Sequence, residues 1–294
     1  MTSPHGIPEP DGPTAEQIAA TIRLLGDERG QLVEMARERL LCWGEPAIEQ
    51  LQVAAEADAM LVRLRARAVL RAFEVQKDLR RFGLLRLDRT GRGSAPSLLE
   101  GIVLLSRMVR TFVPGTDDLG RRLRRHATAL KRECDGRSLP TCARLLAARL
   151  HDQAGLVGNR SVAVDLDRVL VDRVLEGGSG EPVALALVYL LVARWAGLSA
   201  AGVAMPDYFL VRLHGTRPVL VDPLHGGRTI TKADCARYLR ATGHDLVKHH
   251  LRDLTDREML IHYLRALQRA AQNRAVPEAR ETLGQAMSLL ETAW

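Results

Sequence analysis

The chain has 294 residues and 46% of them are hydrophobic, which is enough to fill the core of one large domain or of two ordinary ones. Its longest apolar runs, such as residues 183–193, reach only about half of the roughly 20 residues that a membrane-spanning helix needs, so no transmembrane helix is expected. The net charge is +7, but residues 61–132 hold 18 Lys and Arg against 6 Asp and Glu. That concentration raises the question of an anionic partner.

The N-terminal residues 1–13 are rich in Pro, Gly and acidic residues and lack the charged-then-apolar order of a signal peptide. We therefore expect a disordered tail on a cytoplasmic protein. The four cysteines are scattered without a C-x-x-C pair, which favours neither a zinc site nor a disulfide framework. We expect no metal and no cofactor.

Residues 14–90 predict a helical domain. Thr14 and Gln17 form a capping box for a short helix that ends at Gly26, and further helices are expected over 32–43, after Pro46, and over 59–75. The segments 32–41 and 61–70 align at an offset of 29 residues. This weak internal repeat resembles the helix pairs of HEAT-type solenoids, which leave one face free for partners.

The segment 88–97, with its Gly, Ser and Pro, reads as a linker, and more helices follow it. They are expected over 98–112, over 117–134 after the Pro114–Gly115 break, and from Pro140 to about 155. The second of these three helices contains the densest basic cluster of the chain, formed by Arg121, Arg122, Arg124 and Arg125. The first half of the chain is thus predicted to be all helical.

The chain becomes rich in β-formers after Gly202. Residues 202–213 predict one strand and 218–222 a second, joined by a short Gly-containing hairpin at 214–217. Helical signals then return, with capping boxes at Thr231/Asp234 and Thr255/Glu258 and a last helix after Pro277. Helices, a small antiparallel sheet and further helices imply a mostly helical α+β fold.

Three separated motifs occur in a meaningful order. Gly158–Asn159 comes first, then G-G-S-G-E-P at 177–182 leads into an apolar helix, and finally P-D-Y-F at 206–209 is followed by D-P-L-H-G-G at 222–227. This order resembles the transglutaminase-like superfamily, and within it the bacterial SirB-type branch, which reads G-N, G-x-P-x-S-L, P-G-H-F-L-V-R and D-P-F-x-G-G. The resemblance implies a transglutaminase-like (papain-like) domain over 97–272, followed by a C-terminal helix over 273–294.

Catalytic members of this superfamily place a cysteine at the N-terminus of the helix, a histidine on the next strand and an aspartate on the strand after it. The resemblance puts these positions at Pro182, Tyr208 and Asp222. Proline has no nucleophilic side chain and tyrosine titrates near pH 10, so neither replaces its counterpart. We therefore expect a pseudoenzyme whose groove, lined by these three residues and His225, binds a protein, a peptide or another ligand.

Other interpretations stay open from the sequence. Asp222 is equally explained as a turn residue that caps local N–H groups before Pro223. A divergent cysteine hydrolase or acyltransferase could use a relocated nucleophile, with Cys235, His225 and Asp222 as its triad. Nucleic-acid binding through the basic helices of 61–132 is the third alternative, although aromatic residues make up only 4% of the chain and no reading motif is present.

Overall fold

The computed structural model describes residues 12–85, 95–110, 114–159, 165–245, 247–273 and 277–292. The chain divides into two compact units, residues 1–78 and 79–294. Almost all of the expected tail, 1–13, lies outside the described residues. Within the described ranges, no helix has the combination of length and apolar character that crossing a membrane requires.

The first unit is helical. It contains α1 (Ala15–Leu24), α2 (Gly30–Trp43), the short 3-10 helix η1 (Glu45–Ala47), α3 (Ile48–Ala54) and the first part of α4 (Met60–Gly83). The predicted capping box at α1 is confirmed, because the Thr14 hydroxyl accepts from the Gln17 N–H and the Gln17 side-chain oxygen accepts from the Thr14 N–H. The predicted end of the fourth helix near residue 75 is wrong. Helix α4 continues because Leu79 and Phe82 extend its apolar face into the core of the second unit. The HEAT-like assignment stays a prediction.

The second unit contains most of the helices. They are α5 (Ala95–Val109), α6 (Thr116–Cys134), α7 (Leu139–Ala147), the π-helix η2 (Ala148–Gln153), α8 (Leu166–Val169), α9 (Val171–Gly177), α10 (Pro182–Trp195), α11 (Lys232–Ala241), α12 (Asp256–Asn273) and α13 (Pro277–Thr292), with the 3-10 helices η3 (Pro223–His225) and η4 (Lys248–Leu251). Helix α5 starts inside the predicted linker, whose residues 88–94 lie outside the described ranges.

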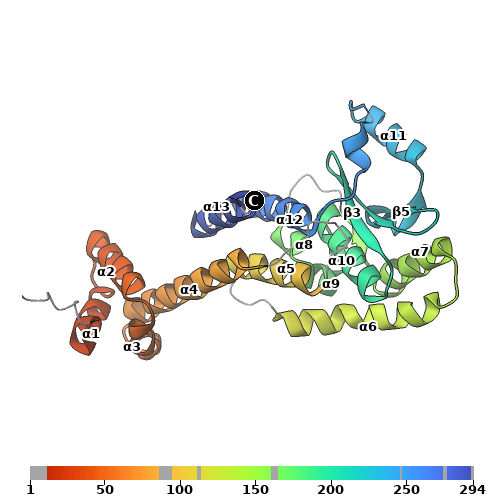
Figure 1. Ribbon diagram of the computed structural model, residues 1–294. Helices are drawn as coiled ribbons and strands as arrows, with labels where there is room; N and C mark the ends of the chain where they lie inside the picture. Colours follow the sequence, from red (N-terminus) through yellow and green to blue (C-terminus); the bar gives the residue numbers. More distant parts are fainter. Residues whose placement is uncertain are drawn as a thin grey trace, which may run out of the picture. The chain divides into compact units, whose positions relative to one another are not determined.

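Helix α10 lies at the centre of the second unit (Figure 1). Every residue from Val183 to Ala193 is buried, because α6, α9, α12 and two strands of the sheet pack around the helix. A helix that is apolar on all sides needs such a complete cover of other elements. The start of α10, where Glu181 is the N-cap and Pro182 the first helical residue, is thereby held in a fixed place.

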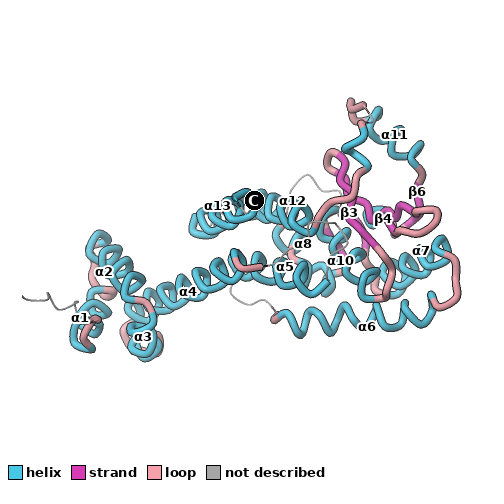
Figure 2. The backbone as a smooth tube through the Cα atoms, viewed as in Figure 1, coloured by secondary structure: helices cyan, strands magenta, loops and turns pink. Residues whose placement is uncertain are grey.

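The sheet has four antiparallel strands in the order β3 (Ala200–Met205), β4 (Tyr208–Leu213), β5 (Val219–Asp222) and β6 (Arg228–Ile230) (Figure 2). The predicted hairpin at 214–217 is confirmed, since Leu213 pairs with Val219. The prediction of a single strand over 202–213 is wrong. Pro206 and Asp207 form a tight turn, in which Asp207 has the left-handed φ of 52°, and Met205 pairs with Tyr208 across it. A further two-stranded parallel sheet joins β1 (Val157–Gly158) to β2 (Ser179–Gly180).

Helix α12 approaches strand β3 closely at Gly202. A Cβ atom at Gly202 would lie 2.3 Å from the Sδ atom of Met259, so only glycine fits there without a shift of the Met259 side chain. The backbone N–H of Leu254, just before α12, donates to the Gly202 carbonyl over 2.8 Å. The predicted Thr255/Glu258 capping box then starts α12, with the Glu258 N–H donating to Thr255 Oγ1. These contacts confirm the expected α+β class and place α12 beside the edge of the sheet.

Candidate functional site

The three positions that the resemblance singled out come together in space. Pro182 is the first residue of α10, Tyr208 the first residue of β4 and Asp222 the last residue of β5. All three line one cavity of about 570 Å³, and His225 and Cys235 line it as well. The structure therefore has an open cavity at this place rather than a filled core.

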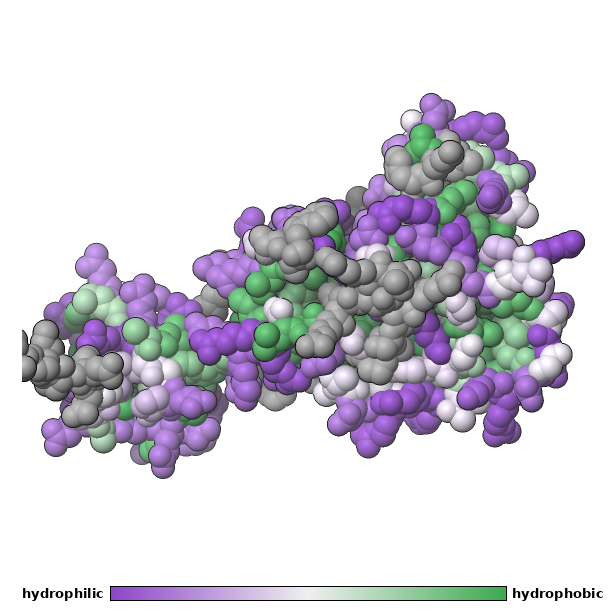
Figure 3. All heavy atoms as spheres, viewed as in Figure 1, coloured by the Kyte–Doolittle hydropathy of each residue, from purple (hydrophilic) through white to green (hydrophobic). Residues whose placement is uncertain are grey.

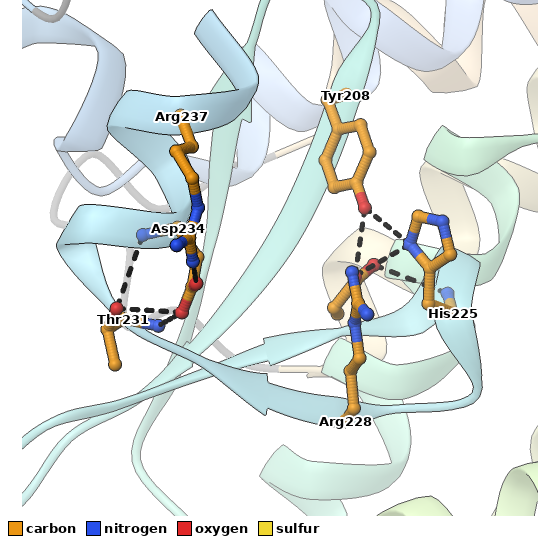
Figure 4. A network of polar contacts seen from close by, with 7 residues as sticks. Tyr208, His225, Arg228, Thr231, Asp234 and Arg237 are labelled. Atoms are coloured by element: carbon orange, nitrogen blue, oxygen red, sulfur yellow. Dashed lines mark hydrogen bonds and ion pairs between the residues drawn. The ribbon is translucent and has the colours of Figure 1, made fainter.

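Asp222 is fully buried and is the centre of a polar cluster in the cavity wall (Figure 4). The Tyr208 hydroxyl donates to Asp222 Oδ2 over 2.8 Å, and His225 Nδ1 lies 2.7 Å from the same oxygen and 2.5 Å from the Tyr208 hydroxyl. Arg228 Nε donates to Oδ2 over 3.2 Å. Because these donors converge on one carboxylate, its charge is compensated although it is removed from water.

The D-P-L-H-G-G motif builds this cluster locally. Asp222 caps the short helix η3, with the His225 N–H donating to Oδ1 over 3.3 Å, so the turn interpretation of Asp222 is confirmed. Gly226 and Gly227 follow with left-handed φ values of 70° and 73°, which glycine adopts at little cost. The Gly227 N–H returns to the Asp222 carbonyl over 2.8 Å. The chain thus turns back into β6 and brings Arg228 to the carboxylate.

Two further polar residues of the cavity, Asn159 and Glu181, form a contact that their separate motifs did not reveal. The Asn159 side chain donates to Glu181 Oε1 over 2.9 Å, and its backbone N–H donates to the Gly180 carbonyl over the same distance. Gly158 precedes it, and a Cβ there would lie 2.2 Å from the Leu224 carbonyl oxygen. The G-N and G-E-P motifs therefore meet each other at the cavity. Both motifs were visible in the sequence, but their contact spans 22 residues and depends on the β1–β2 pairing.

The cavity offers hydrogen-bonding groups and, at Cys235, a thiol. The Tyr208 hydroxyl donates its hydrogen bond to Asp222, and the Pro182 side chain has no nucleophilic atom. The Cys235 side chain is buried, and burial, together with the negative charge of Asp234, raises the pKa of its thiol. No group of three or more His, Cys, Asp or Glu within the described ranges is arranged to hold a metal.

The basic cluster on α6 is largely occupied by intramolecular contacts. Arg121 pairs with Asp118, and Arg122 pairs with Asp118 and Glu176. Arg124 lies over the ring of Trp195, with its guanidinium carbon 5.1 Å from the ring centre. Figure 3 shows hydrophilic side chains along the outer side of α6, at the lower edge of the second unit. This arrangement is typical of a solvated helix face and supplies no observation in favour of nucleic-acid binding.

A family model matches residues 116–265, which include the whole cavity, and its description is the transglutaminase-like superfamily. The chain belongs to the transglutaminase-like superfamily. Among curated proteins, two UPF0162 proteins of Xylella fastidiosa are similar to it. The protein of strain 9a5c is 34% identical over 92 residues, covering 31% of this chain and 33% of the relative, and that of strain Temecula1 is 37% identical over 82 residues, covering 28% and 29%. The chain thus matches only about a third of the length of these relatives, and no solved structure matches it significantly.

Proposed function

We propose that this protein is a non-catalytic member of the SirB-type branch of its superfamily, and that it binds a peptide or another small ligand in the cavity at Pro182, Tyr208 and Asp222. The observation that carries the proposal is the open cavity of about 570 Å³ at the position where the superfamily resemblance places a catalytic triad. A protein that had kept only the fold would be free to fill this space with side chains.

The residues of the cavity wall support binding without turnover. A cysteine at the start of α10 would gain a lowered pKa from the helix N-terminus, whereas Pro182 provides only a rigid apolar wall. The Tyr208 hydroxyl donates to Asp222, so Tyr208 supplies a hydrogen-bond donor rather than a base at this position. The cavity is lined by seven polar or charged residues and seven apolar or aromatic ones, so its wall offers both polar groups that orient a small ligand and apolar surface that covers it.

The relocated-nucleophile alternative requires an activated thiol at Cys235. Such a thiol needs a lowered pKa and a base within hydrogen-bond reach. The buried Cys235 thiol has a raised pKa instead, and among the described residues no hydrogen bond joins Cys235 to His225, whose Nδ1 lies beside Asp222 and Tyr208. These observations favour the binding function over the enzymatic one.

The test has an activity arm and a binding arm. Purified protein is assayed for peptidase, amidase and acyl-transfer activity, and we expect no turnover; turnover that Cys235→Ser abolishes in a folded variant contradicts the proposal. A fragment library is then screened by ligand-observed NMR against the wild type and against Ile230→Trp, which fills the cavity. We expect fragments that bind the wild type and the exposed-surface control Leu289→Trp, but not Ile230→Trp. A library without such fragments removes the ligand site.

A further inference from the structure

A second and larger depression, of about 1030 Å³, adjoins the cavity and shares four lining residues with it, namely Glu181, Pro182, Met205 and Asp207. It is also lined by Arg265 and Arg269 of helix α12, which do not line the cavity. The depression therefore has an acidic end next to the cavity and a basic end at α12. We call it the dipolar depression.

The acidic end carries two carboxylates whose charge is not compensated. Glu181 is the N-cap residue of α10, and its Oε1 accepts from the neutral side chain of Asn159 over 2.9 Å. Asp207 is exposed in the turn between β3 and β4. Neither forms an ion pair with a described residue, whereas the other two acidic residues of the cavity each pair with an arginine. A cation at this end would compensate both carboxylates.

The basic end carries two arginines of the same kind. Arg265 and Arg269 are exposed and have no acidic partner within the described ranges, whereas Arg252, which also lines the depression, pairs with Glu258. The two free arginines are four residues apart, which is about 6 Å along the helix axis. After burial, the positive charge of Arg265 is the largest cause that lowers the pKa of His262, another lining residue, so this charge acts within the depression.

Two carboxylates and two guanidinium groups thus line one depression without pairing with each other. No ion pair within 4.0 Å joins Glu181 or Asp207 to either of the free arginines of α12. Opposite charges that share a depression and stay apart complement a ligand that carries both signs of charge. A purely anionic ligand would be repelled at the acidic end, and a purely cationic one at the basic end. The apolar Pro182 and Met205 can cover the uncharged part of such a ligand.

We propose that the dipolar depression binds a short peptide by its two free ends, with the protonated α-amine at Glu181 and Asp207 and the α-carboxylate at Arg265 and Arg269. The inference rests on the proposed binding function, because it names the class of ligand that the same site takes. The amine end lies at the mouth of the cavity, so the side chain of the first peptide residue enters the cavity beside Met205.

The experiment first screens short peptides against the full chain by ligand-observed NMR. The peptides are X-Ala and X-Ala-Ala, in which X is each of the common amino acids. At about pH 6.5 their α-amine is protonated and their α-carboxyl ionised. The tightest binder is then prepared in N-acetylated and in C-amidated form. We expect each cap to weaken binding about tenfold or more, because it removes one charged partner of a hydrogen bond.

Two double variants assign each cap to one end of the depression. In E181Q/D207N, N-acetylation of the peptide should no longer weaken binding, whereas amidation still should. In R265Q/R269Q the opposite is expected. E181Q keeps the oxygen that accepts from Asn159, and asparagine tolerates the left-handed φ of 52° at position 207. A purely structural effect of either variant would weaken all forms of the peptide alike.

Matched controls neutralise exposed charges elsewhere. E38Q/E49Q removes two carboxylates of the first unit, and R121Q/R125Q removes two arginines of α6 at the same i, i+4 spacing as in α12. Both controls should show the same two capping effects as the wild type.

Three outcomes overturn the inference. They are the absence of any binding peptide, insensitivity of wild-type binding to one of the two caps, and capping effects in E181Q/D207N and R265Q/R269Q that equal those of the controls. None of these alters the fragment screen with Ile230→Trp, which tests the cavity alone. Conversely, turnover of a bound peptide that Cys235→Ser abolishes would keep the ligand class and remove the non-catalytic function.

Discussion

The hydrogen bond from Tyr208 to the buried Asp222 provides the sharpest test of the cluster in the cavity wall. The substitutions are Tyr208→Phe, Asp222→Ala and their combination. Tyr208→Phe deletes one hydroxyl that donates over 2.8 Å to a carboxylate without any exposed surface. Asp222→Ala deletes the acceptor and leaves the tyrosine hydroxyl, whose residue is only 7% exposed, without its anionic partner.

The expected magnitudes follow from these contacts. A hydrogen bond to a charged group contributes about 1.5–3 kcal/mol, so Tyr208→Phe should lower the free energy of unfolding by about 2 kcal/mol. Asp222→Ala also removes the cap of η3, which contributes about 1 kcal/mol, and leaves buried donors without their acceptor. We therefore expect it to lower the free energy of unfolding by about 3–5 kcal/mol. The pair with Arg228 adds little, because the arginine side chain is 62% exposed. In the Asp222→Ala background, Tyr208→Phe should cost less than in the wild type, because the hydroxyl has lost its charged acceptor while its contact with His225 Nδ1 remains.

The assay is urea unfolding followed by the fluorescence of Trp195, with Trp43 and Trp294 replaced by Phe so that the signal comes from the second unit. Tyr238→Phe is the matched control. Its hydroxyl lies in the same cavity but donates over 3.1 Å to the neutral carbonyl of Pro206, so its loss should cost only about 1 kcal/mol.

Two results would refute the reasoning. Equal costs for Tyr208→Phe and Tyr238→Phe would show that the charge of Asp222 does not strengthen the bond. A cost of Tyr208→Phe that is the same with and without the Asp222 carboxylate would show that the two side chains do not interact in solution.

The remaining predictions concern α12, a cysteine and the β3 contact. Hydrogen bonds from Arg252 hold the pKa of the Glu258 carboxyl at about 2, below the unfolded value of about 4.3. The stabilisation of the fold by the ionised carboxylate is therefore present above about pH 4 and is lost as the pH falls towards 2. Glu258→Gln should flatten that part of the pH dependence of the urea midpoint. Iodoacetamide should label the exposed Cys42 of the native protein, while Cys235 reacts only after unfolding. Equal labelling rates of the two cysteines, followed by mass spectrometry, would contradict the burial of Cys235. Gly202→Ala should lower the free energy of unfolding by about 1–3 kcal/mol, since the new methyl group contacts the Met259 side chain of α12. An unchanged urea midpoint would contradict this close contact between Gly202 and Met259.

Local patterns predicted the local structure well. The capping boxes at Thr14, Thr231 and Thr255 are all present, because a cap joins residues only three positions apart and needs no distant partner. The apolar helix before Trp195 was visible as a continuous run. The error at 202–213 has a different origin. The apolar character continues through Pro206 and Asp207, so that only the pairing of Met205 with Tyr208 reveals the turn.

The candidate site shows the same division between near and distant contacts. The contact of Asp222 with His225 spans three residues and follows from a turn that the sequence already suggests. Its contact with Tyr208 spans 14 residues, and the bond of Asn159 to Glu181 spans 22. The order of the motifs indicated that such residues would meet, but not which atoms would form hydrogen bonds.

The sequence alone determined the order of the motifs that contain Pro182, Tyr208 and Asp222, and that order indicated the transglutaminase-like superfamily. Only the tertiary structure decided that an open cavity remains at Pro182. The physical reason is that its walls come from segments far apart in the sequence, namely the start of α10, strands β4 and β5 and helix α11. Their meeting depends on the pairing register of β4 with β5 and on the packing of α10 against the sheet.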